Sequence, residues 1–142
     1  MTTVALVNPT TLLGKELREN LERRRDLWTD IRLLSGEEEE IGTLTEIGGA
    51  AAIVSRADLD DLAAARLVFF CGSRESSLPL LAELLAAATA IVLAADATSE
   101  DGVPLVAGVN LDDGLVGAEP GRPLLSPHPG ALMLVYLLHP LR

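Results

Sequence analysis

Short unbroken apolar runs alternate along this chain with segments whose apolar residues recur at helical spacing. Such runs are typical of strands that are buried on both faces of a sheet. They span residues 4–7, 31–34, 51–54, 67–70 and 90–93. Between them, residues 11–25 and 58–65 predict helices, and Ser77 and Pro79 are predicted to begin a third helix that continues to residue 88.

The remaining segments complete the predicted order of elements. Residues 41–47 alternate between apolar and polar, which favours an edge strand or one arm of a hairpin. A short strand at 103–106, a Gly/Asp-rich loop at 108–121 and an apolar helix close the chain. Strands separated by helices need crossover connections, so we expect one Rossmann-like, doubly wound α/β domain over residues 1–142, with a mainly parallel sheet and helices on both faces.

Parallel sheets of this kind bind ligands beyond the carboxyl ends of their strands. The segments predicted to lie there are residues 8–14, 35–37 and 71–76, together with Asp96. We therefore expect any functional residues at these positions.

Composition narrows the possible partners and location. The net charge of −10 disfavours binding to nucleic acid or to an anionic membrane, because both need clustered basic side chains, so we expect neither as a partner. One cysteine, Cys71, allows no internal disulfide, and the two histidines, His128 and His139, lie too far apart to predict a metal site. No signal peptide or membrane span is visible, so we expect a cytoplasmic protein.

Five stretches together resemble one known family. They are "VALVNPTTLLGKEL", "IRLLS", "LVFFCGSRESS", "VPLVAGVN" and "LLSPHPGALMLVYLLHPL". In order and spacing they are similar to the N-terminal NAD(P)-binding domain of the aspartate-semialdehyde dehydrogenase family, an oxidoreductase family of amino-acid biosynthesis. The resemblance covers nearly the whole chain.

The resemblance also implies departures at the catalytic positions. The family's nucleophilic cysteine corresponds to Pro129, and its neighbour to His128, which is better explained as a turn residue than as a catalytic base. Where the family begins its second, catalytic and dimerising domain, this sequence stops at Arg142. We therefore expect that domain to be absent and assign no catalytic residue; Cys71 is expected to be a small buried apolar residue.

The cofactor positions implied by the resemblance are altered as well. Asn8 and Thr11 stand where the dinucleotide fingerprint has glycines, and only Gly14 remains. Glu37 is a possible partner for the ribose of NAD, and Ser73, Arg74 and Ser76 for an anion, although a solvated loop and a helix cap explain these residues better. Any binding of NAD or NADP is therefore expected to be weak. The candidate contacts are Asn8, Thr10, Thr11, Gly14, Ser35, Gly72 and Ser73.

Two functional hypotheses follow. The first is a catalytically inactive, semialdehyde dehydrogenase-like domain that acts as a scaffold or as a partner-binding or homo-oligomerising module through its last helix. The second is a weak NAD(P)- or nucleotide-binding domain that becomes an oxidoreductase only with a separate catalytic half. The helix residues expected to contact a partner are Leu132, Val135, Tyr136 and Leu138.

Overall fold

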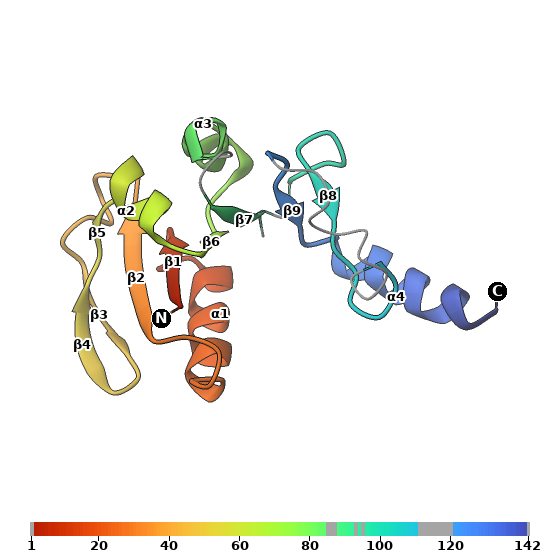
Figure 1. The fold of residues 1–142 in the computed structure, drawn as a ribbon, viewed down its shortest axis with the longest axis horizontal. Coiled ribbons are helices and arrows are strands. Elements are labelled where there is room, and N and C mark those ends of the chain that lie inside the picture. The colour runs from red at the N-terminus through yellow and green to blue at the C-terminus, as the bar shows by residue number, and fades with distance from the viewer. Residues whose placement is uncertain (1, 85–87, 93, 95, 111–120, 142) are drawn as a thin grey trace.

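The computed structural model describes residues 2–84, 88–92, 94, 96–110 and 121–141, and a parallel sheet runs through them (Figure 1). All seven strands of this sheet are parallel, which confirms the predicted fold class. In spatial order the strands are β5 (Ser55–Arg56), β2 (Asp30–Ser35), β1 (Thr3–Val7), β6 (Leu67–Phe70), β7 (Thr89–Val92), β9 (Leu124–Leu125) and β8 (Val103–Pro104).

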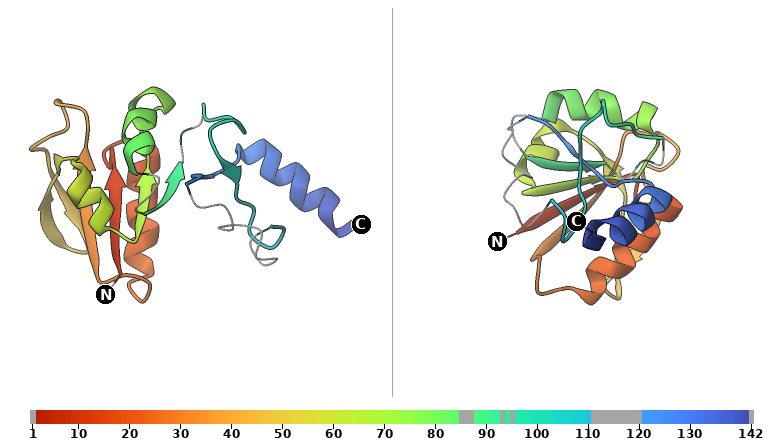
Figure 2. Two further views of the ribbon diagram at one scale, coloured as in Figure 1. Left: turned by 45° about the horizontal axis from the view of Figure 1, so that its top comes forward. Right: turned by 90° about the vertical axis from the view of Figure 1, so that its right-hand side faces the viewer.

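Helices cover both faces of the sheet, as Figure 2 shows when the molecule is viewed end-on. On one face, α1 (Leu12–Arg23) packs its Leu17 and Leu21 over Val4 and Leu6 of β1. On the other face, α2 (Leu59–Ala64) and α3 (Arg74–Leu84) cover the alternate residues of the same strand. Because successive side chains of a strand point to opposite faces, the apolar run of β1 contributes to both layers.

The last helix is arranged differently from the other three. Helix α4 (Pro129–Leu138) begins near the carboxyl edge of the sheet, extends away from it and continues into a short 3₁₀ turn at His139–Leu141 (Figures 1 and 2). None of its residues is fully buried. The predicted closing helix is therefore present, but within the described chain it does not pack on the sheet as α1 to α3 do.

The prediction of a buried strand at residues 51–54 was wrong. Strand β4 (Ala50–Ile53) pairs in antiparallel fashion with β3 (Leu44–Ile47) and forms a separate two-stranded hairpin. The cause is the two-residue connection of Gly48 and Gly49, whose φ angles of 61° and 79° suit the tight hairpin turns that match strand twist. The prediction of a hairpin arm within residues 41–47 is confirmed by β3.

The third helix begins earlier than predicted. It begins at Arg74 and contains Pro79, because the Ser73 hydroxyl accepts a hydrogen bond from the backbone N–H of Ser76 and thus caps the helix. Residues 85–87, 93 and 111–120, which fall in the predicted third helix, fifth strand and closing loop, lie outside the described residues.

The hairpin turn provides a test of this account. We expect Gly49→Ala to lower the free energy of unfolding by about 1 kcal/mol, because a side chain at positive φ is strained even though open space surrounds this position. Gly36→Ala is the matched control, since its added methyl group would make only an ordinary contact with Leu80, at 3.6 Å. Urea unfolding measures both variants, and a Gly49→Ala protein as stable as the wild type would contradict the turn geometry.

Candidate functional site

Three neighbouring loops meet at the carboxyl edge of the sheet, where ligands were expected. Strand β1 pairs with β2 on one side and with β6 on the other, so the chain leaves these strands at Asn8, beyond Ser35 and at Cys71. This is the point at which the strand order reverses, and it is where open α/β sheets hold their ligands. The topology thus brings together the predicted residues Asn8, Ser35 and Gly72.

Asn8 fills the space between these loops. It is only 1% exposed and has a φ of 58°, a left-handed conformation that asparagine tolerates better than most residues. Its backbone N–H donates to the Leu34 carbonyl (2.9 Å), and its side-chain Nδ2 donates to Ser35 Oγ (3.1 Å). A Cβ on Gly72 would lie 2.7 Å from Asn8 Oδ1, so Gly72 is needed to admit this amide.

The first turn of α1 is closed by its own residues. Thr11 Oγ1 accepts a hydrogen bond from the Gly14 N–H (3.1 Å) and lies 2.8 Å from the Cys71 carbonyl, to which its hydroxyl can donate. A Cβ on Gly14 would lie 2.7 Å from the carbonyl carbon and oxygen of Pro9, so this glycine allows close packing of helix and loop. Thr11 therefore acts as the N-cap of α1.

Glu40 was missed by the sequence reasoning. Its carboxylate accepts hydrogen bonds from Asn8 Nδ2 (3.3 Å) and from the Thr10 hydroxyl, so the acidic loop after β2 folds back onto the first loop. The predicted candidate, Glu37, is exposed, and hydrogen bonds reach only its backbone, whose N–H donates to Ser35 Oγ (3.0 Å) and whose carbonyl accepts from the Glu40 N–H (3.0 Å). A run of four glutamates gives no indication of which one turns inward.

The loop after β6 also contacts carboxylates. The backbone N–H of Arg74, at the start of α3, donates to Asp96 Oδ1 (3.0 Å). The Arg74 guanidinium forms a two-pronged pair with Asp101, with contacts of 2.7 and 2.8 Å. Because Ser73 caps the same helix, the residues considered for an anion are engaged with other parts of the chain.

Cys71 lies beneath this edge and is almost fully buried. Burial, reinforced by the nearby negative charge of Glu40, raises the pKa of its thiol to about 12. A neutral thiol is neither a nucleophile nor a metal ligand at physiological pH. The observed burial confirms the expectation of a small buried residue.

A cavity of about 520 Å³ lies beside this edge, between the start of α1 and the start of α4. The segment 125–129 forms one wall, and Leu132 and Leu13 contribute apolar surface. His128 Nδ1 accepts from the Gly130 N–H (3.1 Å), so this ring caps α4, and Pro129 occupies the first helical position. The described lining contains hydroxyl groups and this imidazole but no thiol or carboxylate.

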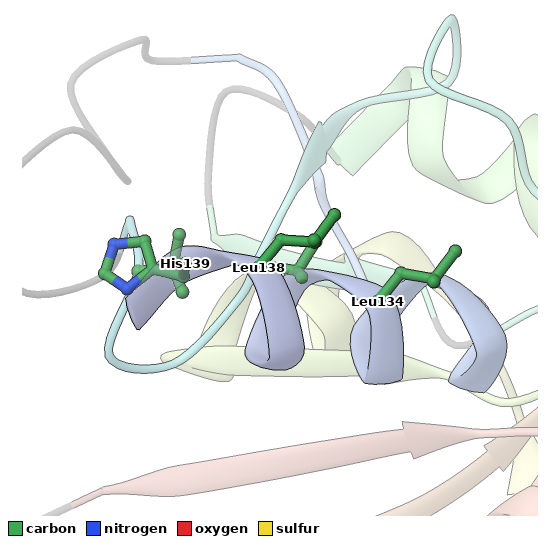
Figure 3. A pocket seen from close by; sticks show the side chains of 5 residues that line it. Leu134, Leu138 and His139 are labelled. Carbon is green, nitrogen blue, oxygen red and sulfur yellow. The ribbon is translucent and has the colours of Figure 1, made fainter. Parts of the chain in front are cut away.

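A second, smaller hollow of about 240 Å³ lies along α4 itself. Leu134, Leu138 and His139 line it from the helix, with the two leucine side chains on the same face (Figure 3). The Tyr136 hydroxyl donates to the Ala107 carbonyl (3.0 Å), which ties the helix to the segment after β8.

The predicted contact residues on α4 divide into two pairs. Leu132 and Val135 are half-buried, whereas Tyr136 and Leu138 are exposed. The sequence reasoning missed three further large apolar side chains that are exposed on this helix, which are Met133, Leu134 and Leu137.

Within the described ranges, no group of three or more His, Cys, Asp or Glu residues is placed to hold a metal ion. No helix in that same part of the chain combines the length and hydropathy needed to span a membrane.

Comparison with known proteins places the fold. No protein-family model and no curated protein matches the sequence. Among solved structures, a probable aspartate-semialdehyde dehydrogenase from Pseudomonas aeruginosa matches 99% of this chain with a TM-score of 0.84 and 26% identity. Aspartate semialdehyde dehydrogenase II from Vibrio cholerae, complexed with ASA, matches 99% with a TM-score of 0.81 and 19% identity.

The match concerns one part of those proteins. The chain covers 42% of the length of each of these two structures and corresponds to their N-terminal part. The aspartate semialdehyde dehydrogenase from Francisella tularensis matches less closely, with a TM-score of 0.64 and 15% identity over 90% of this chain. The predicted resemblance to the N-terminal domain of aspartate-semialdehyde dehydrogenases is therefore confirmed at the level of structure.

This fold implies a dinucleotide whose phosphates approach the first loop and the start of α1. The residues present do not fit that group. Thr11 already caps the helix, and the Glu40 carboxylate lies against Asn8 and Thr10, where it would repel a phosphate. The loop that would meet a 2′-phosphate carries four consecutive glutamates, residues 37–40, and no basic residue.

The buried thiol provides one test of the site. We expect Cys71 in the native protein to resist an aromatic disulfide reagent at pH 8, because burial excludes the reagent and keeps the thiol protonated. The same chain in urea should react fully and quickly. Since this is the only cysteine, absorbance reports it directly, and rapid labelling of the native protein would contradict the described burial.

The Arg74–Asp101 pair predicts a pH dependence. Hydrogen bonds from Arg74, and then from Thr98, lower the pKa of Asp101, whose side chain is 6% exposed. A carboxyl with a lowered folded-state pKa stabilises the fold above its unfolded pKa of about 4 and loses that contribution as pH falls further. The difference in unfolding free energy between wild type and Asp101→Asn should therefore be largest near neutral pH and shrink below about pH 4.

The matched control is Asp26→Asn, which removes an exposed pair with Arg24. Urea unfolding at several pH values should show a much smaller difference for this variant, because solvent screens the pair. An Asp101→Asn protein as stable as the wild type at neutral pH would contradict the role given to this pair.

Proposed function

We propose that this chain is a catalytically inactive scaffold with the fold of a semialdehyde dehydrogenase N-terminal domain, which associates with a second copy of itself through α4. The observation that carries the proposal is the surface of this helix. Its five large exposed apolar side chains have relative exposures from 50% for Tyr136 to 68% for Leu137. Burying one such side chain contributes roughly 1.5–3 kcal/mol, so this surface favours a partner.

The lack of charged residues on α4 favours a second copy as that partner. The chain has a net charge of −10, so two copies repel each other over most of their surface. Residues 124–141 contain no Asp, Glu, Lys or Arg, so two α4 helices can approach without bringing like charges together. An uncharged helix also has no ionic groups with which to form ion pairs with a strongly charged partner.

Shape supports the same arrangement. Met133 and Leu137, one turn apart, form an apolar row next to Leu134 and Leu138. The hollow beside Leu134 and Leu138 (Figure 3) is a receptacle for a leucine or methionine from a second helix. At ten residues α4 is about 15 Å long, which is short for a standard interface of about 800 Å² per partner, so we expect concentration-dependent association.

The absence of a suitable nucleophile supports the inactive part of the proposal. The chain resembles only the N-terminal domain of the semialdehyde dehydrogenases, whose catalytic cysteine lies in the other domain, and its own single cysteine, Cys71, is buried. The second hypothesis, weak binding of NAD or NADP with a separate catalytic half, is less favoured because Glu40 and Thr11 occupy the first loop.

Light scattering after gel filtration tests the proposal across a wide range of concentrations. The wild type should move from monomer towards dimer as concentration rises, and Leu137→Glu should stay monomeric, because the new charge would be buried without a partner. Leu44→Glu is the matched control, since Leu44 is as exposed, at 69%, but lies on the β3–β4 hairpin. It should dimerise like the wild type.

A wild type that stays monomeric throughout, or a Leu137→Glu protein that still dimerises, would overturn the role of α4. Formation of NADPH from aspartate semialdehyde, NADP and phosphate by the purified chain would overturn the inactive part.

A further inference from the structure

Two side chains join two loops at the carboxyl edge of the sheet. Asn8 Nδ2 carries two N–H groups, and both have acceptors, one on Ser35 (3.1 Å) and one on Glu40 (3.3 Å). Glu40 uses its other oxygen for the Thr10 hydroxyl. The loop before α1, the end of β2 and the acidic loop after it are thereby connected through one buried amide.

The loop after β6 closes the space beside the Asn8 amide. Gly72 lies against the Asn8 amide so closely that an added Cβ would be 2.7 Å from Oδ1 and 2.6 Å from Ser76 Oγ. At the start of α3, a second carboxylate, that of Asp96, accepts from the Arg74 N–H (3.0 Å). Carboxylates of the chain itself thus meet the polar groups of two loops where the fold would place an external anion.

We infer that Asn8 and Glu40 form a polar plug that closes this edge to dinucleotide phosphates and holds the acidic loop against the start of α1. The plug gives the loops hydrogen-bond partners from within the chain, which a bound cofactor would otherwise supply. It does not depend on the association of α4, because its residues and those of that helix are different.

The chemistry of the pair makes the inference testable. An amide that donates to a carboxylate is attractive, whereas two carboxylates at the same distance repel each other. Asn8→Asp makes this change at the contact with Glu40 and preserves the side-chain shape, while the Ser35 hydroxyl can donate to the new carboxylate oxygen. Aspartate, like asparagine, tolerates the left-handed backbone at this position, so the change acts mainly through the contact with Glu40.

The experiment is a double-mutant cycle measured by thermal unfolding. We expect Asn8→Asp to lower the Tm by about 4 °C and the added Glu40→Gln change to restore much of that loss, since an amide again faces a carboxylate. Glu39→Gln in the Asn8→Asp background is the matched control. It removes the same charge from an exposed neighbour that has no hydrogen bond or ion pair among the described residues, so it should restore little.

Ligand addition completes the test. Millimolar NAD, NADP or inorganic phosphate should leave the Tm of the wild type unchanged. A rise in Tm with any of these three probes, or equal rescue by Glu40→Gln and Glu39→Gln, would overturn the plug. Neither result bears on the dimer, which is measured separately, so failure of the plug and failure of the proposed function can be told apart.

Discussion

The arrangement of the carboxyl edge depends on one buried amide. Asn8 lies where β1 ends, and its side chain must satisfy its hydrogen bonds inside the protein because almost none of it reaches solvent. It does so by contacting Ser35 and Glu40, and its bulk explains why Gly72 has no room for a side chain. This one amide thus contacts residues of the loops that follow β2 and β6.

The same constraint separates the framework of the fold from the edge at which such folds bind a dinucleotide. The parallel sheet and the packing of α1 rest on apolar residues and on Gly14, none of which needs a cofactor. The loop edge, in contrast, is completed by carboxylates of the chain. The similarity to solved aspartate-semialdehyde dehydrogenases is a similarity of this framework.

Most of the framework could be predicted from the sequence, because buried parallel strands and amphipathic helices leave strong periodic patterns. The strand predicted at 51–54 failed because an apolar run looks the same in a hairpin as in a central strand, and the Gly48–Gly49 turn decided between them. Glu40 was missed because one inward-facing carboxylate in a run of four has no local signal. The exposure of α4 was also invisible locally, since an apolar helix is ordinarily buried.

The most direct measurement of the central claim, that this edge is closed by the chain's own side chains, is an amide NMR spectrum recorded during titration with NADP. The informative signals are the backbone amides of Gly14 and Gly72 and the side-chain amide of Asn8. The account predicts that all three stay at their positions while NADP rises to millimolar concentration. Saturable shifts of the Gly14 and Asn8 signals would show a phosphate entering the first loop and would contradict it.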